Sequence, residues 1–223
     1  MGKDHTSSQF DAELNVVRAR LLEMGGKVEV MIANSMKSLV ERDSALAETT
    51  IASDAEINAM EIEIDEKCLH ILARRQPAAR DLRFVTLALK IVTDLERIGD
   101  QCASIARHAV ELNREAQLKP YIDLPRMAER ANDAVREALD AFVRGDTPAA
   151  VRVCRDDSIL DELNEQLQRE LLTFMMEDPA TIGRAMRITS ISKYLERIAD
   201  HATNIAEMVI FMVHGKDIRH SMV

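Results

Sequence analysis

The chain carries one string of residues twice, once in each half. Asp-Leu-Glu-Arg-Ile-Gly-Asp occupies 94–100 and Tyr-Leu-Glu-Arg-Ile-Ala-Asp occupies 194–200, an offset of 100 residues. Upstream, Asp43 aligns with Asp146 and Asp54 with Asp157, so the similarity extends well beyond one motif. Because a duplicated sequence repeats one set of structural elements, the fold is expected to contain two copies of one unit. We place these units at 1–118 and 119–223.

Helix-breaking residues divide each half into three segments. With only 7 glycines and 5 prolines in the chain, the breaks are easy to locate. Asp43 or Ser44, Asp123, Asp146 and Asp178 are expected to be N-caps, because short polar side chains accept hydrogen bonds from free backbone N–H groups. The predicted helices are about 10–41, 44–74, 77–115, 123–143, 148–177 and 179–213.

Local details of two helices follow from single residues. Gly25-Gly26 is expected to loosen or kink the first helix, since glycine disfavours helix by roughly 1 kcal/mol. Pro77 and Pro148 suit the first turn of a helix, where no N–H bond is lost. The third helix carries an apolar stripe at three-and-four spacing. Its members are Val85, Leu89, Val92, Leu95, Cys102 and Ala106.

The composition supports an all-α fold. Aromatic residues make up 3% of the chain and tryptophan is absent, while Ala, Leu, Ile, Met, Glu and Arg dominate; these residues favour long packed helices. We therefore expect two tandem three-helix bundles, six long antiparallel helices in all, whose cores can be continuous.

Charge, hydropathy and cysteine content limit the function classes. The net charge of -9 disfavours a nucleic-acid partner. The longest apolar run, 208–213, is too short to insert into a membrane, and the polar N-terminus lacks a signal peptide pattern. Cys68, Cys102 and Cys154 are too far apart in sequence for a C-x-x-C pair, which disfavours disulfides and thiolate zinc. A cytoplasmic location is expected.

Two acidic pairs are the main candidates for a binding site. Glu96 with Asp100, and Glu196 with Asp200, each lie one turn apart at the edge of an apolar stripe. Like charges at this spacing repel each other, so a positive group is expected nearby. Carboxylates suit a divalent metal such as magnesium, manganese, iron or zinc. The alternative is that these carboxylates are ordinary surface charges at the edge of the apolar stripe, neutralised by Arg97, Lys193 or Arg197.

Weaker candidates accompany these pairs. Glu207 continues the edge of the sixth helix and Asn204 lies further round it, whereas Arg107 stands at the first-half position that corresponds to Glu207. The two sites need not be equivalent. Asp94 is predicted to lie nearly on the solvent face of the third helix. Together with Arg83, Lys90 and Arg97 it would form a stripe available to a partner.

Motifs for catalysis are missing from the sequence. It contains no Glu-x-x-His, which disfavours a ferritin-type oxidase. It also lacks H-E-x-x-H, G-x-S-x-G and the phosphate-binding glycine loops. Cys102 lies in the apolar stripe and is expected to be inert. We expect neither an enzyme nor an organic cofactor. A metal-binding or storage bundle without a signalling role remains as an alternative function.

Longer strings resemble the PhoU family of bacterial phosphate-transport accessory proteins. They are FDAEL at 10–14, LEMGG at 22–26, ILARRQPA at 71–78 and YLERIADHATNIAE at 194–207. The resemblance covers nearly the whole chain. It implies two three-helix bundles, often in a homodimer, with E(D)-x-x-x-D motifs that bind metal in some members. Those motifs correspond to Glu96 with Asp100 and Glu196 with Asp200.

The resemblance also implies a regulatory function. Such proteins repress the phosphate-starvation response and restrain phosphate uptake when phosphate is plentiful. Their expected partners are the ATPase subunit of the phosphate ABC transporter and the phosphate sensor histidine kinase. An adaptor of this kind acts through different affinities for two states of a partner.

Overall fold

Six long helices account for the fold in the computed structural model, which describes residues 2–75, 77 and 79–215. They follow one another with short connections, and the longest connection joins the two halves. The helices are α1 Gly2–Val40, α2 Ser44–Arg75, α3 Ala79–Leu112, α4 Asp123–Arg144, α5 Thr147–Glu177 and α6 Ile182–His214. A short 3₁₀ turn, η1 Pro179–Thr181, precedes α6. The all-α prediction is confirmed.

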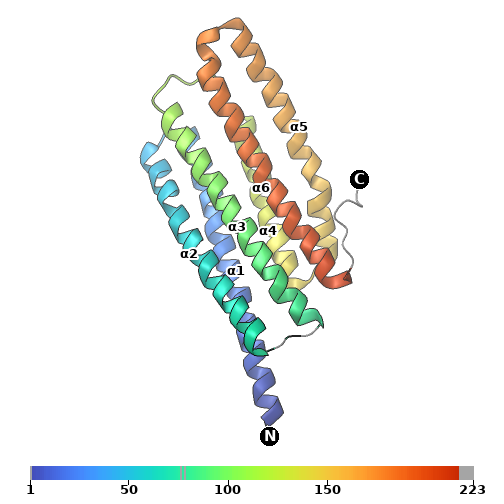
Figure 1. The fold of residues 1–223 in the computed structure, drawn as a ribbon. Helices are drawn as coiled ribbons and strands as arrows, with labels where there is room; N and C mark the ends of the chain where they lie inside the picture. Colours follow the sequence, from blue (N-terminus) through green and yellow to red (C-terminus); the bar gives the residue numbers. More distant parts are fainter. Residues whose placement is uncertain (1, 76, 78, 216–223) are drawn as a thin grey trace.

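The two repeats pack along α3 and α6, which run antiparallel (Figure 1). Contacts between these helices include a hydrogen bond from Arg83 Nε to the Met212 carbonyl, 3.1 Å long. At the opposite end, Arg187 Nε bonds Glu111 Oε2 at 2.6 Å. Helix α1 also contacts α4, whereas α2 contacts only α1 and α3 among the described helices. Helices α2 and α5 therefore lie at the outer edges of the body.

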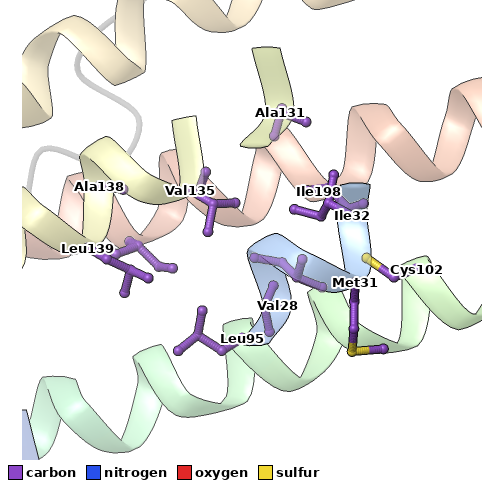
Figure 2. Packing of buried hydrophobic residues seen from close by; sticks show 14 of the residues in the cluster. Val28, Met31, Ile32, Leu95, Cys102, Ala131, Val135, Ala138, Leu139 and Ile198 are labelled. Carbon is purple, nitrogen blue, oxygen red and sulfur yellow. The ribbon is translucent and has the colours of Figure 1, made fainter. Parts of the chain in front are cut away.

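One continuous core joins the repeats. Figure 2 shows side chains from both halves facing the same interior: Val28 and Ile32 of α1, Leu95 of α3, Val135 of α4 and Ile198 of α6. Helices α3 and α6 are covered on several sides, α3 by α1, α2 and α6, and α6 by α3, α4 and α5. The predicted stripe on α3 is buried, with only Leu89 partly exposed.

Helix α1 begins at Gly2 and not near residue 10, so its predicted start was wrong, whereas the other boundaries fall within three residues of the predicted ones. The remaining differences concern caps. Asp43 and Asp146 accept hydrogen bonds from the N–H groups of Leu46 (2.9 Å) and Ala149 (3.0 Å), as expected of N-caps. Asp178 caps the 3₁₀ turn instead of α6 itself. The prediction for Asp123 was wrong. This residue opens α4 after Ile122 and makes ion pairs instead of a cap.

Two further predictions were wrong: the placement of Pro77 in a first helical turn and the break at Gly25-Gly26. Pro77 lies before α3 and not within its first turn. Helix α1 runs unbroken through Gly25 and Gly26. Gly25 is buried against α4, where an added Cβ would lie 2.3 Å from Leu139 Cδ1. Close helix packing thus explains the first glycine better than a break does.

Cys68 and Cys102 are free and buried, and Cys154 is partly buried. Burial raises the pKa of the Cys68 thiol to about 12 and also raises that of Cys102. A thiol held in its neutral form is a poor nucleophile. None of the described helices is long and apolar enough to cross a bilayer.

Candidate functional site

The first acidic pair lies on α3 beneath the outer helix α2. The Glu96 side chain is 17% exposed and that of Asp100 is 40% exposed. Arg97 lies 3.5 Å from Glu96 Oε2 through Nε and 3.7 Å from Asp100 Oδ2 through Nη1. This arginine is the positive group expected near the pair. It is mostly exposed, so solvent weakens its attraction for the carboxylates.

Helix α2 adds polar groups that sequence reasoning did not assign to the site. Asp54 and Glu61 of α2 lie close enough for charge interactions with this pair, and Asn58 lies beside Asp54. Asn58 Nδ2 donates to Asp54 Oδ2 at 3.5 Å, while Asp54 Oδ1 is buried without a hydrogen-bond partner among the described residues. Gly99 of α3 faces this part of α2, where an added Cβ would lie 3.2 Å from Ile57 Cγ2 and 3.4 Å from Asp54 Oδ1.

Electrostatics show that these carboxylates form one cluster, which we call the first acidic cluster: Asp54, Glu61, Glu96 and Asp100. Burial raises the pKa of Asp54 above its ordinary value, and the charge of Asp100 raises it further. Burial, followed by the charges of Asp100 and Glu61, also raises the pKa of Glu96. Burial and like charges both disfavour the ionised forms of these carboxyl groups, so an added positive charge would stabilise those forms.

The second acidic cluster joins α5 to α6 and consists of Asp161, Glu196 and Asp200. The Glu196 side chain, 15% exposed, forms an ion pair with Lys193 and accepts a hydrogen bond from Asn164 Nδ2. Burial raises the pKa of both Asp161 and Asp200, and the charge of Glu196 adds to each shift.

The two clusters are related but not identical. The alignment that pairs Asp54 with Asp157 also pairs Asn58 with Asp161 and Glu61 with Asn164. A carboxylate and an amide have therefore changed places on the outer helix, while the pair on the inner helix is kept. Gln168 Nε2 donates to Asn164 Oδ1 at 3.2 Å and fixes the orientation of this amide. The side chain of Asp157 lies outside the described residues.

The weaker candidates have other positions. Asp94 does not lie on the solvent face, since its side chain is only 14% exposed and its Oδ1 lies 2.8 Å from His201 Nδ1 across the α3–α6 contact. Arg83 likewise bonds the α6 backbone. The predicted surface stripe of Arg83, Lys90, Asp94 and Arg97 is thus partly an internal contact between the repeats. On α6, Asn204 is exposed and Glu207 is partly buried.

The clusters have donor types that fit a divalent cation. All the candidate ligands are oxygen atoms, and Asp54 Oδ1 is buried without a partner, an arrangement that a hard cation would stabilise. Within the described part of the chain, no three His, Cys, Asp or Glu residues already stand in a metal-binding arrangement. Asp54, Glu96 and Asp100 would hold a metal in the first repeat, and Asp161, Glu196 and Asp200 in the second.

These features define a class: a duplicated helical protein with paired acidic clusters between inner and outer helices. Comparison with known proteins then gives the family. The model of the PhoU domain matches residues 21–109 and 124–209. This chain belongs to the PhoU family.

Individual relatives agree with this assignment. The Pseudomonas putida protein named phosphate-specific transport system accessory protein PhoU homolog is 46% identical over 97% of this chain and 85% of its own length. The Escherichia coli accessory protein PhoU is 38% identical over 97% of this chain and 90% of its own.

Solved structures show the same architecture. The crystal structure of PhoU from Pseudomonas aeruginosa has a TM-score of 0.90 at 45% identity, covering 93% of this chain and 100% of that one. PhoU from Streptococcus pneumoniae, a phosphate transport system regulatory protein, has a TM-score of 0.86 at 28% identity, covering 93% and 98%.

Proposed function

We propose that this protein is a cytoplasmic negative regulator of the phosphate-starvation response and of phosphate uptake. It acts as an adaptor between the ATPase subunit of a phosphate ABC transporter and a sensor histidine kinase. The main support is similarity over nearly the full chain to accessory proteins of phosphate-specific transport, with both repeats matched by the family model. It regulates by binding and not by catalysis.

The architecture suits an adaptor. Two outer helices, α2 and α5, leave long faces away from the shared core. A rigid body of this kind can hold two partners in a fixed relation. To transmit phosphate status, its affinity must differ between two states of the transporter or of the kinase.

The acidic clusters are proposed to bind a divalent metal, either magnesium or manganese, or iron or zinc. A bound cation would neutralise carboxylates that now repel one another and would join an outer helix to an inner helix. Asp54 with Glu96 and Asp161 with Asp200 are the pairs through which this link would form. Metal occupancy would thereby stiffen α2 and α5 against the core.

A pull-down tests both parts. The purified ATPase subunit and the cytoplasmic domain of the kinase are captured by this protein, with and without divalent metal. The doubly substituted Glu196→Gln, Asp200→Asn protein should bind metal or partner more weakly while keeping its helical content. A matched control is Glu41→Gln with Asp133→Asn, two exposed carboxylates outside the clusters.

The possible results distinguish between the proposed functions. Metal-dependent capture that is lost in the cluster variant supports the whole proposal. Capture that ignores metal and substitution supports the adaptor but removes the metal from its mechanism. Metal binding without capture of either partner would favour the alternative of a metal-binding or storage bundle.

A further inference from the structure

Four exposed apolar side chains gather where α5 ends and α6 begins. Their exposed fractions range from 45% to 83%, and Met176 is the most exposed of them. Single exposed apolar residues are common, whereas a group of them at one place is typical of a contact surface. We call this surface the α5–α6 tip. It consists of Leu172, Met176 and Glu177 of α5, Asp178, and Ile182 and Met186 of α6.

Two contacts between α5 and α6 show that these side chains form one surface. Asn164 Nδ2 donates to Glu196 Oε2, and Thr181 Oγ1 donates to the Phe174 carbonyl oxygen at 3.0 Å. Because the two helices run antiparallel between these contacts, equal steps along each helix stay level. This register places the apolar side chains in two level pairs, one helical turn apart. The pairs are Leu172 with Met186 and Met176 with Ile182.

The corresponding end of the first repeat, where α2 ends and α3 begins, distinguishes shared features from specific ones. Its Leu69 and Leu82 are 57% and 41% exposed. They align with Leu172 and Ile182, so two exposed apolar residues at this end are common to both repeats. The remaining positions differ in size and in charge. Ala73, Thr86, Arg74 and Arg75 align with Met176, Met186, Glu177 and Asp178.

The α5–α6 tip is therefore the more apolar and the acidic one of two equivalent ends. Methionine replaces alanine and threonine, and two carboxylates replace two arginines. The fold is the same at both ends, so core packing does not require these differences. Flexible thioether side chains adapt to apolar partners of different shape, and exposed carboxylates attract a positive group. This composition fits a partner helix with one apolar side and one basic side.

We propose that the α5–α6 tip binds a basic amphipathic helix of a protein partner. The proposal rests on the adaptor function proposed above and names the chemistry of one partner's docking segment. Apolar side chains of that helix contact Met176 and Met186, and its basic side chains lie beside Glu177 and Asp178. In contacts of this kind apolar anchors supply most of the binding energy, while charge sets the orientation.

The charges around the tip favour this partner over others. Glu177 and Asp178 are exposed, and neither forms an ion pair with any residue in the part of the chain that the structure describes. The second acidic cluster lies further along the same two helices, so the negative charge continues beyond the tip. These carboxylates would repel an anionic lipid surface. In the first repeat, Arg74 and Arg80 are exposed at the equivalent end and would repel a basic helix.

The two equivalent ends give the adaptor two docking positions that a partner can distinguish. The α5–α6 tip and the end of α2 that carries Arg74 lie at opposite ends of the body (Figure 1). A basic helix is attracted to the first and repelled by the second, and selection of this kind uses the repulsive surface as well as the attractive one. A partner bound at the α5–α6 tip leaves the other end of the body accessible to a second partner.

Fluorescence anisotropy with a synthetic peptide tests the proposal on the full chain. The peptide is a helix of leucine and lysine whose leucines all lie on one side. The tip variant Met176→Ala, Glu177→Arg, Met186→Thr carries the residues of the first repeat at the aligned positions, so it should fold as that end does. It should bind the peptide at least about tenfold more weakly, since it lacks both methionine anchors and reverses one charge.

Two controls accompany the tip variant. The variant Val16→Ala, Val30→Thr removes exposed apolar side chains of α1 and should bind the peptide as the wild type does. A peptide with glutamate in place of lysine should not bind the wild type, because the carboxylates of the tip repel it. Circular dichroism checks that both variants keep their helical content.

Equal binding of the lysine peptide by the wild type and the tip variant would overturn the proposal. Two further results would overturn it by assigning the tip another occupant. If the wild type binds phosphatidylglycerol vesicles and the tip variant does not, the tip contacts a membrane. If the tip variant loses self-association in sedimentation equilibrium, the tip contacts a second copy of this chain.

Capture of the purified ATPase subunit and of the kinase domain is measured with the same variants. The tip variant should lose capture of one of these partners and keep the other, whereas capture of both by the tip variant would overturn the proposal. If the wild type captures neither partner, the adaptor function fails, and the peptide titration still decides whether the tip binds a basic amphipathic helix. Failure of the two proposals is therefore distinguishable.

Discussion

Gly25 and Gly26 are adjacent in α1 but have different surroundings. A Cβ at Gly26 would meet nothing within 4 Å, whereas a Cβ at Gly25 would collide with Leu139 of α4. We expect Gly26→Ala to stabilise the protein by about 0.5–1 kcal/mol through the better helix propensity of alanine. Gly25→Ala should instead destabilise it by about 1 kcal/mol, because overpacking outweighs that gain. Urea denaturation of both variants measures the difference, and equal effects would contradict the packing role of Gly25.

Glu96 should reduce stability at neutral pH when no metal is present. The pKa of Glu96 is raised in the folded protein above the ordinary 4.5, so folding favours the protonated side chain. This contribution to stability is fully present below the ordinary value and is lost as pH rises through the folded-state pKa. Glu96→Gln should therefore raise the free energy of unfolding at pH 7 by at least the roughly 0.2–0.5 kcal/mol of a like-charge i,i+4 pair. The gain should shrink at pH 4. Denaturation in the presence of a chelator gives both values.

Glu111 provides a control of opposite sign. Its hydrogen bond with Arg187 lowers its pKa, so its contribution is present above the ordinary value and is lost as pH falls through the folded-state pKa. Glu111→Gln should therefore lower stability at pH 7. If both substitutions changed stability in the same direction, the assigned electrostatic environments would be wrong.

Two members of each acidic cluster could be predicted from the sequence, and the reason is geometric. Glu96 with Asp100 and Glu196 with Asp200 belong to a repeated string on one helix, where spacing alone shows that they are neighbours. Asp54 and Asp161 reach the clusters from other helices. Their contribution depends on how α2 and α5 are rotated about their axes, which hydrophobic periodicity does not determine. Glu61 of α2 aligns with Asn164 of α5, so a comparison of the two repeats does not show a carboxylate at this position in both clusters.

At the scale of the helix, the helix-breaking residues predicted where helices begin and end. They did not predict which side chain makes each N-cap. Asp146 and Asp123 both stand at a predicted helix start. Only Asp146 accepts a bond from an N–H of the first turn, because its backbone is extended, whereas the residue before Asp123 is already in the helical region. Cap geometry depends on the path of the preceding loop, and the sequence does not specify that path.

Asp146→Ala should destabilise the protein by about 1 kcal/mol, since it leaves the N–H of Ala149 without its side-chain acceptor at the start of α5. Asp146→Asn should recover most of the loss, because an amide oxygen can accept the same bond. Thermal denaturation of the two variants tests this assignment. A loss as large for asparagine as for alanine would show that the negative charge, and not the cap, stabilises this position.

At the scale of the whole molecule, the duplication correctly predicts six helices but not how independent the two repeats are. The shared core and the α3–α6 contact lead us to expect one cooperative unfolding transition. Leu95 and Leu195 are equivalent, and both are fully buried. Leu95→Ala and Leu195→Ala should each cost about 2–5 kcal/mol and should each lower the midpoint of the same transition. Calorimetry tests this directly: two transitions, each shifted by the substitution in its own repeat, would mean that the repeats unfold separately. One transition shifted by either substitution would mean that a change in one repeat is felt by the other, which is the mechanical property that an adaptor between two partners needs.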